Sequence, residues 1–310
     1  MEYEEFRKRL RVEERLDWKE LATFVPNKQL PIYNWFYYKE GFSKELVEKI
    51  IAMFEMEEGD TVLDPFCGSG TTIVACIQNG VNAIGFDVLP TAVFASQVKT
   101  TKYNSEKLRE EAKKLFRKRF YKLEWKFPKI MRAMINKYAL EDISFFLTEI
   151  NQLEHKDFFA LALLNTSIKV SYAWKDGGVI KIKRHPVPPL RRLYQRIVYR
   201  MIADVEKNQL RGDAVVNQCD ARHMTIENES VDAIITSPPY LNNIDYTKLY
   251  AIEEFFMEAR KMPMLRSYMG MREQVEKKET YFEDMEEVLR EMHRVLKSGG
   301  KAAIILGNAY

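Results

Sequence analysis

The stretch from Asp60 to Asp87, "DTVLDPFCGSGTTIVACIQNGVNAIGFD", constrains the fold more than any other part of the sequence. It opens with a short apolar run that predicts a buried strand, and the glycine-rich loop "PFCGSG" follows. "TTIVACIQNG" predicts a helix that ends at Gly80, and "VNAIGFD" predicts a second strand that ends in an acid. A strand–loop–helix–strand unit of this kind is the first half of a doubly wound parallel sheet.

The other strands are expected in the last third of the sequence. Strand character returns in "DAVVNQCD" (213–220), "VDAIITSPPY" (231–240) and "GKAAIILGN" (300–308), with helices expected at 247–258 and 281–296. Strands that alternate with helices favour parallel pairing with right-handed crossovers. We therefore predict an α/β fold with a doubly wound, mostly parallel, Rossmann-like sheet.

The segment before the first strand is polar at its start and aromatic further on. Residues 1–20 are expected to form a charged, exposed helix, and residues 24–42 an irregular segment with two prolines. A helix is expected at 43–55, because apolar residues recur there at helical spacing and Ser43 is a good N-cap.

Residues 104–208 interrupt the sheet and predict a helical insertion, with helices over 105–125 and 141–174. The insertion is basic, since four lysines and five arginines face one acid between Lys169 and Arg200. The expected organisation is an N-terminal segment with the first half of the sheet domain in 1–103, the insertion in 104–208, and the second half of the sheet domain in 209–310.

The composition excludes several classes of protein. The 310 residues contain no run of eighteen apolar residues, so no membrane span is expected, and the charged N-terminus does not resemble a secretory signal. The three cysteines are too few for a disulfide framework, and none has a metal-ligand spacing with a histidine. We expect a cytoplasmic protein that holds no metal.

The glycine loop has the features of a site for a ligand without phosphate. Gly68 and Gly70 allow a tight turn and a close backbone approach. Asp87, which ends the second strand, is placed to take ribose hydroxyls. A dinucleotide motif would have a third glycine, but Ile73 occupies that position, and the carboxylate of Asp64 would repel pyrophosphate. S-adenosylmethionine, with its ammonium group and ribose hydroxyls, suits these residues.

The end of the strand 231–236 has a different chemistry. The hydroxyl of Ser237 and a carbonyl of Pro238, whose direction the next proline fixes, could accept hydrogen bonds from an exocyclic base amine. These bonds would draw the nitrogen towards a pyramidal, nucleophilic shape. Tyr240 could stack on a base that has swung out of the duplex.

These two motifs carry a resemblance to a known family. "DPFCGSGTT" resembles the cofactor loop of the DNA amino-methyltransferases. "TSPPY" resembles their catalytic tetrad, in the serine-first form typical of enzymes that modify cytosine at N4, whereas adenine N6 enzymes more often begin it with Asp or Asn. "YYKEGFS" and "NQCDAR" are weaker matches, and the resemblance extends over residues 30–100 and 213–310.

The resemblance implies a role for each matching residue. The methionine part of the cofactor would be held by Asp64, Phe66, Gly68 and Gly70, and its carboxylate would be flanked by Phe42 and Ser43. Asp87 would take the ribose hydroxyls, and Asp220 the adenine amine. The target base would be bound and activated by Ser237, Pro238, Pro239 and Tyr240. DNA is the expected partner, with contacts from Lys183, Arg184, Arg191, Arg192 and Arg196 in the insertion.

The resemblance also implies an incomplete sheet, because the family's sheet ends in an antiparallel hairpin and only one strand follows "VLKSGG" here. Either the polypeptide is a fragment or a partner completes the sheet, and we expect a second chain or self-association to cover that edge. The predicted function is methylation of cytosine N4 in DNA, near the nucleoid, in a restriction–modification system. Two alternatives stay open: methylation of adenine N6 in DNA or of a guanine amine in RNA, and a nucleic-acid-binding subunit that is inactive without its partner.

Overall fold

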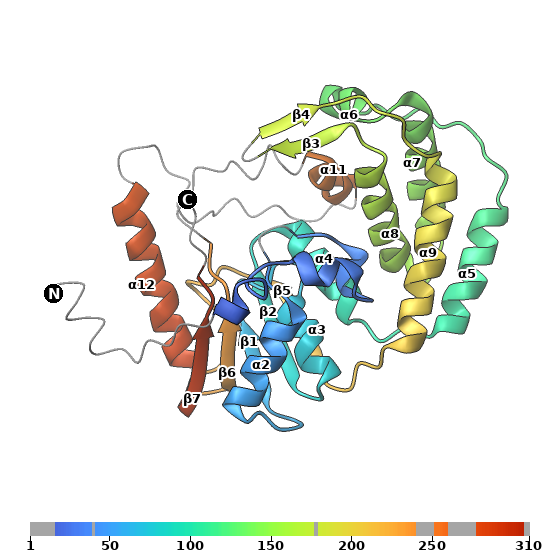
Figure 1. Ribbon diagram of the computed structural model, residues 1–310. Helices are drawn as coiled ribbons and strands as arrows, with labels where there is room; N and C mark the ends of the chain where they lie inside the picture. The colour runs from blue at the N-terminus through green and yellow to red at the C-terminus, as the bar shows by residue number, and fades with distance from the viewer. Residues whose placement is uncertain (1–15, 39–40, 177–178, 240–250, 260–276, 307–310) are drawn as a thin grey trace.

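The computed structural model describes residues 16–38, 41–176, 179–239, 251–259 and 277–306. Its centre is a parallel sheet with the strand order β5-β2-β1-β6-β7 (Figure 1). The strands are β1 (Thr61–Asp64), β2 (Asn82–Asp87), β5 (Ala214–Gln218), β6 (Val231–Thr236) and β7 (Leu296–Ile304). The predicted doubly wound α/β fold is therefore confirmed.

Two cores cover the two faces of the sheet, because successive strand residues point to opposite sides. The flanking helices are α2 (Lys44–Phe54), α3 (Thr71–Gln78), α4 (Pro90–Thr100), α11 (Ala251–Ala259) and α12 (Lys277–Val295). Val62 and Ile235 pack on the face that α2 and α3 cover. Leu63 and Ile234 pack on the opposite face, against α12. This alternation fixes the register of the strands and hence which residues reach their carboxyl ends.

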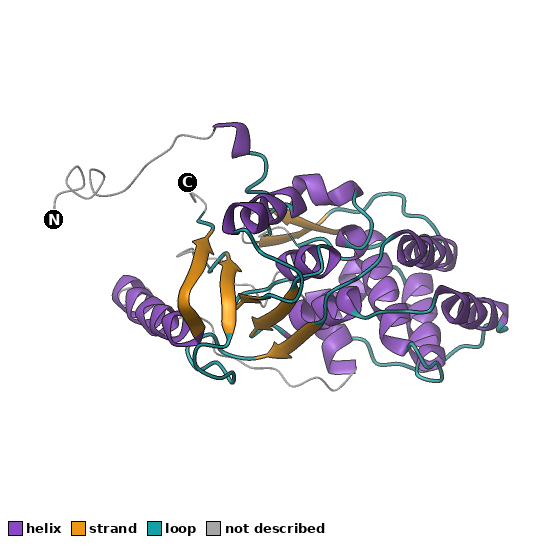
Figure 2. Ribbon diagram, turned by 90° about the horizontal axis from the view of Figure 1, so that it is seen from below, coloured by secondary structure: helices purple, strands orange, loops and turns teal. Residues whose placement is uncertain are grey.

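A second region is built mainly from helices. It comprises α5 (Ser105–Arg117), α6 (Lys129–Met134), α7 (Lys137–Ile150), α8 (Lys156–Lys169), α9 (Leu190–Lys207) and the hairpin of β3 (Ala173–Asp176) and β4 (Val179–Ile182). Figure 2 shows these helices gathered on one side of the sheet, with α12 on the other flank. Ten consecutive residues of α8, from Phe158 to Ser167, are buried, so this helix is the centre of the region.

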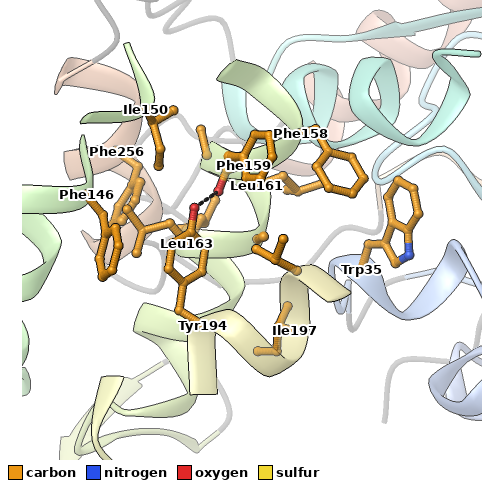
Figure 3. Close-up of a cluster of buried hydrophobic side chains, with 14 of the residues drawn as sticks. Trp35, Phe146, Ile150, Phe158, Phe159, Leu161, Leu163, Tyr194, Ile197 and Phe256 are labelled. Atoms are coloured by element: carbon orange, nitrogen blue, oxygen red, sulfur yellow. Dashed lines mark hydrogen bonds between the residues drawn. The ribbon is translucent and has the colours of Figure 1, made fainter. Parts of the chain in front are cut away.

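The core around α8 extends beyond the helical region. Tyr194 of α9 donates a hydrogen bond from its hydroxyl to the carbonyl of Phe159, at 3.0 Å (Figure 3). Trp35 and Phe256, from outside residues 104–208, pack in the same cluster. The helical region therefore shares its core with the N-terminal segment and with α11, and the predicted domain boundaries stay predictions.

Several expected elements differ in the structure. The segment 24–42 holds two short 3-10 helices, η2 (Val25–Gln29) and η3 (Tyr33–Trp35). Of the helix expected at 1–20, the structure describes only the short 3-10 helix η1 (Leu16–Trp18) and the turn after it.

The helical region also differs from its expectation. The helix expected at 105–125 ends at Arg117, and the helix expected at 141–174 is divided between α7, α8 and β3. The hairpin was not predicted, although its "DGG" turn sequence is a hairpin signal. No helix of the described residues has the length and apolarity to cross a membrane.

Candidate functional site

The carboxyl ends of β1 and β6 meet at the point where the order of the strands reverses. Ligands bind at this point in open α/β sheets. The hydroxyl of Thr236, the last residue of β6, donates to Oδ1 of Asp64, the last residue of β1, at 2.7 Å. This bond brings the glycine loop after Asp64 and the Ser-Pro-Pro segment after Thr236 to the same edge of the sheet.

The glycine loop needs both of its glycines. Gly68 and Gly70 have φ values of 51° and 82°. Residues other than glycine rarely adopt these positive values. A Cβ on Gly70 would lie 2.3 Å from Oγ of Ser96, and a Cβ on Gly68 would lie 3.0 Å from the ring of Tyr38. The loop therefore packs closely against α4 on one side and against the N-terminal segment on the other.

Two buried carboxylates lie at this edge. Asp87 accepts hydrogen bonds from the backbone N–H groups of Gly68 and Leu89, each at 2.9 Å. Asp64 accepts from the N–H of Phe66 at 3.1 Å, besides the bond from Thr236. Burial raises the pKa of both acids to about 6, in spite of these bonds. Carboxylates in this setting favour a ligand that brings a positive charge or hydroxyl donors.

A buried lysine that the sequence analysis missed connects the loop to the N-terminal segment. Lys99 is 2% exposed, and its Nζ donates to the carbonyl of Ser69 at 3.0 Å and to that of Phe36 at 3.2 Å. Burial lowers its pKa to about 7. The signal was its position on α4, since Lys99 shares one helical face with Ala92 and Ser96, which are both buried.

The segment before α2 is held by an asparagine that was also missed. Asn27 is fully buried, donates to the carbonyl of Phe42 at 2.8 Å and accepts from the N–H of Lys44 at 2.9 Å. The predicted N-cap is confirmed, because Oγ of Ser43 accepts from the N–H of Leu46. Contact of Phe42 and Ser43 with the methionine carboxylate stays a prediction.

The Ser-Pro-Pro segment is fixed from two sides. The hydroxyl of Ser237 donates to the carbonyl of Ile305 at 2.9 Å, just beyond the end of β7. This bond uses the hydroxyl proton, so the oxygen of Ser237 acts as an acceptor towards other groups. The hydroxyl of Tyr281, on α12, donates to the carbonyl of Pro239 at 2.9 Å. The contact of Tyr281 with this segment was not predicted. The predicted base-stacking residue Tyr240 lies outside the described residues.

The remaining expected cofactor residues have other contacts. Asp220 is bound by the guanidinium of Arg222, with Oδ2 and Nη2 at 2.6 Å, and Arg222 also bonds to Asp284 of α12. Phe66 is half-buried and packs on the core that faces α12. The roles of Asp220 and Phe66 at a cofactor stay predictions.

The five basic residues expected at DNA divide into two groups. Four of them are exposed: Lys183, Arg184, Arg192 and Arg196. Arg191 is half-buried, donates to the carbonyl of Lys118 at 2.9 Å and lies 5.3 Å from the centre of the Phe145 ring. Its guanidinium therefore joins helices of the region, a role that the charge count alone did not indicate.

Comparison with known proteins identifies the relatives of this chain. The model of the DNA methylase family matches residues 17–98 and 231–310, more than half of the chain. The Type II methyltransferase M.BsoBI of Geobacillus stearothermophilus is 28% identical over 295 residues, which cover 80% of this chain and 57% of that protein. M.AvaI of Nostoc sp. is 28% identical over 284 residues, with coverage of 80% and 58%. The chain thus spans less than two thirds of the length of these relatives.

Two further comparisons are weaker. M.MjaII of Methanocaldococcus jannaschii is 23% identical over 427 aligned positions, covering 99% of this chain and 80% of that protein. The solved rRNA methyltransferase aviRa of Streptomyces viridochromogenes is 12% identical over 94% of this chain and 82% of its own, with a TM-score of 0.33, too low to bear on fold or function.

Methyltransferases of this family use S-adenosylmethionine, and the described residues fit that cofactor. The buried carboxylate of Asp64 suits an ammonium group, and Asp87 suits ribose hydroxyls. The match over both halves of the sheet and this site lead to the same conclusion: the chain belongs to the DNA methylase family.

Proposed function

We propose that this chain transfers a methyl group from S-adenosylmethionine to the exocyclic N4 amine of cytosine in DNA, in a restriction–modification system. The observation that carries the proposal is the hydrogen bond from Thr236 to Asp64, because it brings the cofactor loop next to Ser237. The similarity to Type II methyltransferases supports the coarser part of the proposal, a DNA methyltransferase of a restriction–modification system.

The acids at the edge of the sheet would bind and orient the cofactor, which supplies an electrophilic methyl group when bound. Asp64 would pair with its ammonium group and Asp87 would accept from its ribose hydroxyls. Both carboxylates are already fixed by backbone N–H groups, so little reorganisation accompanies binding.

The Ser-Pro-Pro segment would activate the amine. One amine hydrogen would be donated to Oγ of Ser237 and the other to the carbonyl of Pro238, which draws the nitrogen lone pair out of conjugation with the ring. The nitrogen would accept the methyl group as the sulfonium–methyl bond breaks to leave a neutral thioether, and it would release one proton to solvent. The hydrogen bond from Tyr281 to Pro239 supports this role, because it holds the segment in one orientation.

The target base is tested by mass spectrometry of nucleosides from DNA and RNA incubated with the protein and S-adenosylmethionine. We expect N4-methylcytosine in DNA, and far less of it in the same time with the Ser237→Ala variant. N6-methyladenine in the DNA would reject the cytosine assignment, and a methylated guanine in the RNA alone would reject DNA as the substrate.

A second candidate is a subunit that transfers methyl groups only when a second copy of the chain covers β7. Ile304 and Leu306 are 40% and 68% exposed at this edge, and Phe282 and Leu289 are exposed on α12 beside it. β7 is the last strand of the described sheet, and an unpaired edge strand is a template for pairing. Light scattering tests this candidate: a dimer that Ile304→Lys separates with loss of methyl transfer supports it, and an active monomer rejects it.

A further inference from the structure

A second basic segment lies outside the block that the sequence analysis singled out. From Lys113 to Lys137 the sequence has ten lysines and arginines and a single acid, Glu124. The segment runs from the end of α5, through residues without helix or strand, to α6 and the start of α7. Neither the cofactor site nor the Ser-Pro-Pro segment accounts for this charge.

Aromatic contacts attach the segment to the catalytic half of the molecule. The ring of Phe127 lies 5.3 Å from that of Phe255 on α11, and Trp125 lies 6.4 Å from the same ring. α11 is the first described helix after the Ser-Pro-Pro segment. The basic segment is therefore held beside the helix that follows the proposed base-binding residues.

A backbone contact joins the same segment to the β3–β4 hairpin. The N–H of Tyr172 donates to the carbonyl of Met134 at 2.7 Å, and the N–H of Lys183 donates to the carbonyl of Tyr172 at 2.8 Å. The hairpin presents Trp174, which is 62% exposed, and it is followed by the exposed Lys183 and Arg184. Backbone hydrogen bonds thus join the two basic parts of the sequence.

Part of the charge on these two basic parts is already neutralised. Lys118 pairs with Glu149, and Lys122 pairs with Glu141. Lys126, Lys129 and Arg132 are exposed, and no carboxylate of the described residues pairs with them. We call these three cations, together with Trp174, Lys183 and Arg184, the α6 face.

The location of the α6 face suits a partner that reaches the site. In Figure 1, α6 and the hairpin lie at the top, on the side of the sheet where the strands end, and α5 lies at the far right. Unpaired cations beside an exposed tryptophan are the combination that binds a phosphate backbone and stacks on bases.

We propose that the α6 face binds the DNA that flanks the target base, with Lys126, Lys129 and Arg132 on phosphates and Trp174 against a base or sugar. This proposal rests on the proposed function, because DNA must be the substrate for the face to meet it. It adds three cations and an aromatic residue to the contacts expected from sequence.

Two matched triple variants test the phosphate contacts. K126A/K129A/R132A removes the three cations of the α6 face, and K113A/K114A/R117A removes three exposed cations from α5. Both lower the net charge equally, so any effect of total charge is the same. DNA affinity is measured by fluorescence anisotropy over a range of salt concentrations, and thermal unfolding checks that both variants fold.

We expect the α6 variant to bind DNA about 30-fold more weakly and its slope of log K against log salt to fall by about 3, one for each lost phosphate contact. The α5 variant should bind within about twofold of the wild type. Trp174→Ala should weaken binding about tenfold and leave the salt slope unchanged, because stacking carries no charge.

The outcomes separate this proposal from the proposed function. Equal weakening by the two triple variants, or no weakening by either, would overturn the phosphate contacts, and an unchanged affinity of Trp174→Ala would overturn the stacking contact. A wild-type protein that binds S-adenosylmethionine but neither binds nor methylates DNA would instead reject the proposed function.

Discussion

The sheet and the helical region bury their side chains in different ways. In β1 and β6, neighbouring residues point to opposite faces of the sheet. Each side chain therefore packs in only one of the two cores. In α8, ten consecutive residues are buried on all sides of one helix. The polar groups at the ends of the strands are tied by hydrogen bonds, whereas the core around α8 is built mainly from apolar side chains (Figure 3), although α8 also buries Asn165, Thr166 and Ser167.

The difference indicates where stability and chemistry reside. Substitutions in the core around α8 should lower the free energy of unfolding and should not change cofactor affinity. Substitutions at the strand ends should change cofactor affinity or turnover, with smaller effects on unfolding. A substitution around α8 that changed cofactor affinity would contradict this division. A strand-end substitution that acted mainly on the free energy of unfolding would contradict it as well.

The largest effect is expected in the helical core. Phe159→Ala removes a fully buried ring and should lower the free energy of unfolding by about 3 to 5 kcal/mol, with unchanged cofactor affinity in the folded protein. Urea denaturation measures the first quantity and calorimetry the second. Phe282→Ala, at a 65% exposed phenylalanine on α12, is the control and should change unfolding by less than about 0.5 kcal/mol.

The next effect is expected on turnover. Ser237→Ala removes the hydroxyl that is fixed by the carbonyl of Ile305 and should lower kcat by about 100- to 1,000-fold, the usual consequence of losing one positioned polar group. The dissociation constant for S-adenosylmethionine should be unchanged. A matching loss of cofactor affinity would show that Ser237 belongs to the cofactor site.

A smaller effect is expected on cofactor affinity. Asp87→Ala removes the acceptor for the N–H groups of Gly68 and Leu89 and the expected partner of the ribose. We expect cofactor binding to weaken about 10- to 100-fold, since a hydrogen bond to a charged group contributes about 1.5 to 3 kcal/mol. Calorimetric titration measures this, and unchanged affinity would contradict the assignment of Asp87.

Lys99→Met tests the link between the glycine loop and the N-terminal segment. Methionine has a similar length but no donors, so the carbonyls of Ser69 and Phe36 lose their partner. We expect cofactor binding to weaken about fivefold, at the lower end of the cost of an unsatisfied buried group. Lys102→Met is the matched control, because Lys102 pairs with Asp213 at the surface; equal behaviour of the two variants would contradict the link.

The pH dependence should separate binding from stability. The pKa values of Asp64 and Asp87 are raised to about 6, so cofactor affinity should fall as the pH drops below about 6, where both carboxylates take up protons. The free energy of unfolding should change in the opposite direction to cofactor affinity, and rise as the pH falls. The folded protein binds more protons than the unfolded chain between pH 4 and 6, so these two groups make it more stable as the pH falls. Titrations and denaturation at pH 7 and pH 5 test both signs.

The positions of the chemical groups in the sheet could be predicted from sequence because they follow from local rules. Two prolines end β6 at Thr236, and glycines mark the turn after Asp64. Parallel strands then bring their carboxyl ends to one edge. The contacts of Lys99, Asn27 and Tyr281 could not be predicted, because each joins residues that are at least 15 positions apart.

The sequence by itself determined the strand–loop–helix–strand unit, the parallel sheet and the residues at the ends of its strands, since these depend on backbone preferences and on the two-residue period of a strand. The tertiary structure alone decided that Arg191 packs inside the helical region while Lys126, Lys129 and Arg132 remain exposed beside the hairpin. The physical reason is that whether a charge is used by the fold or left for a partner depends on which elements pack against it.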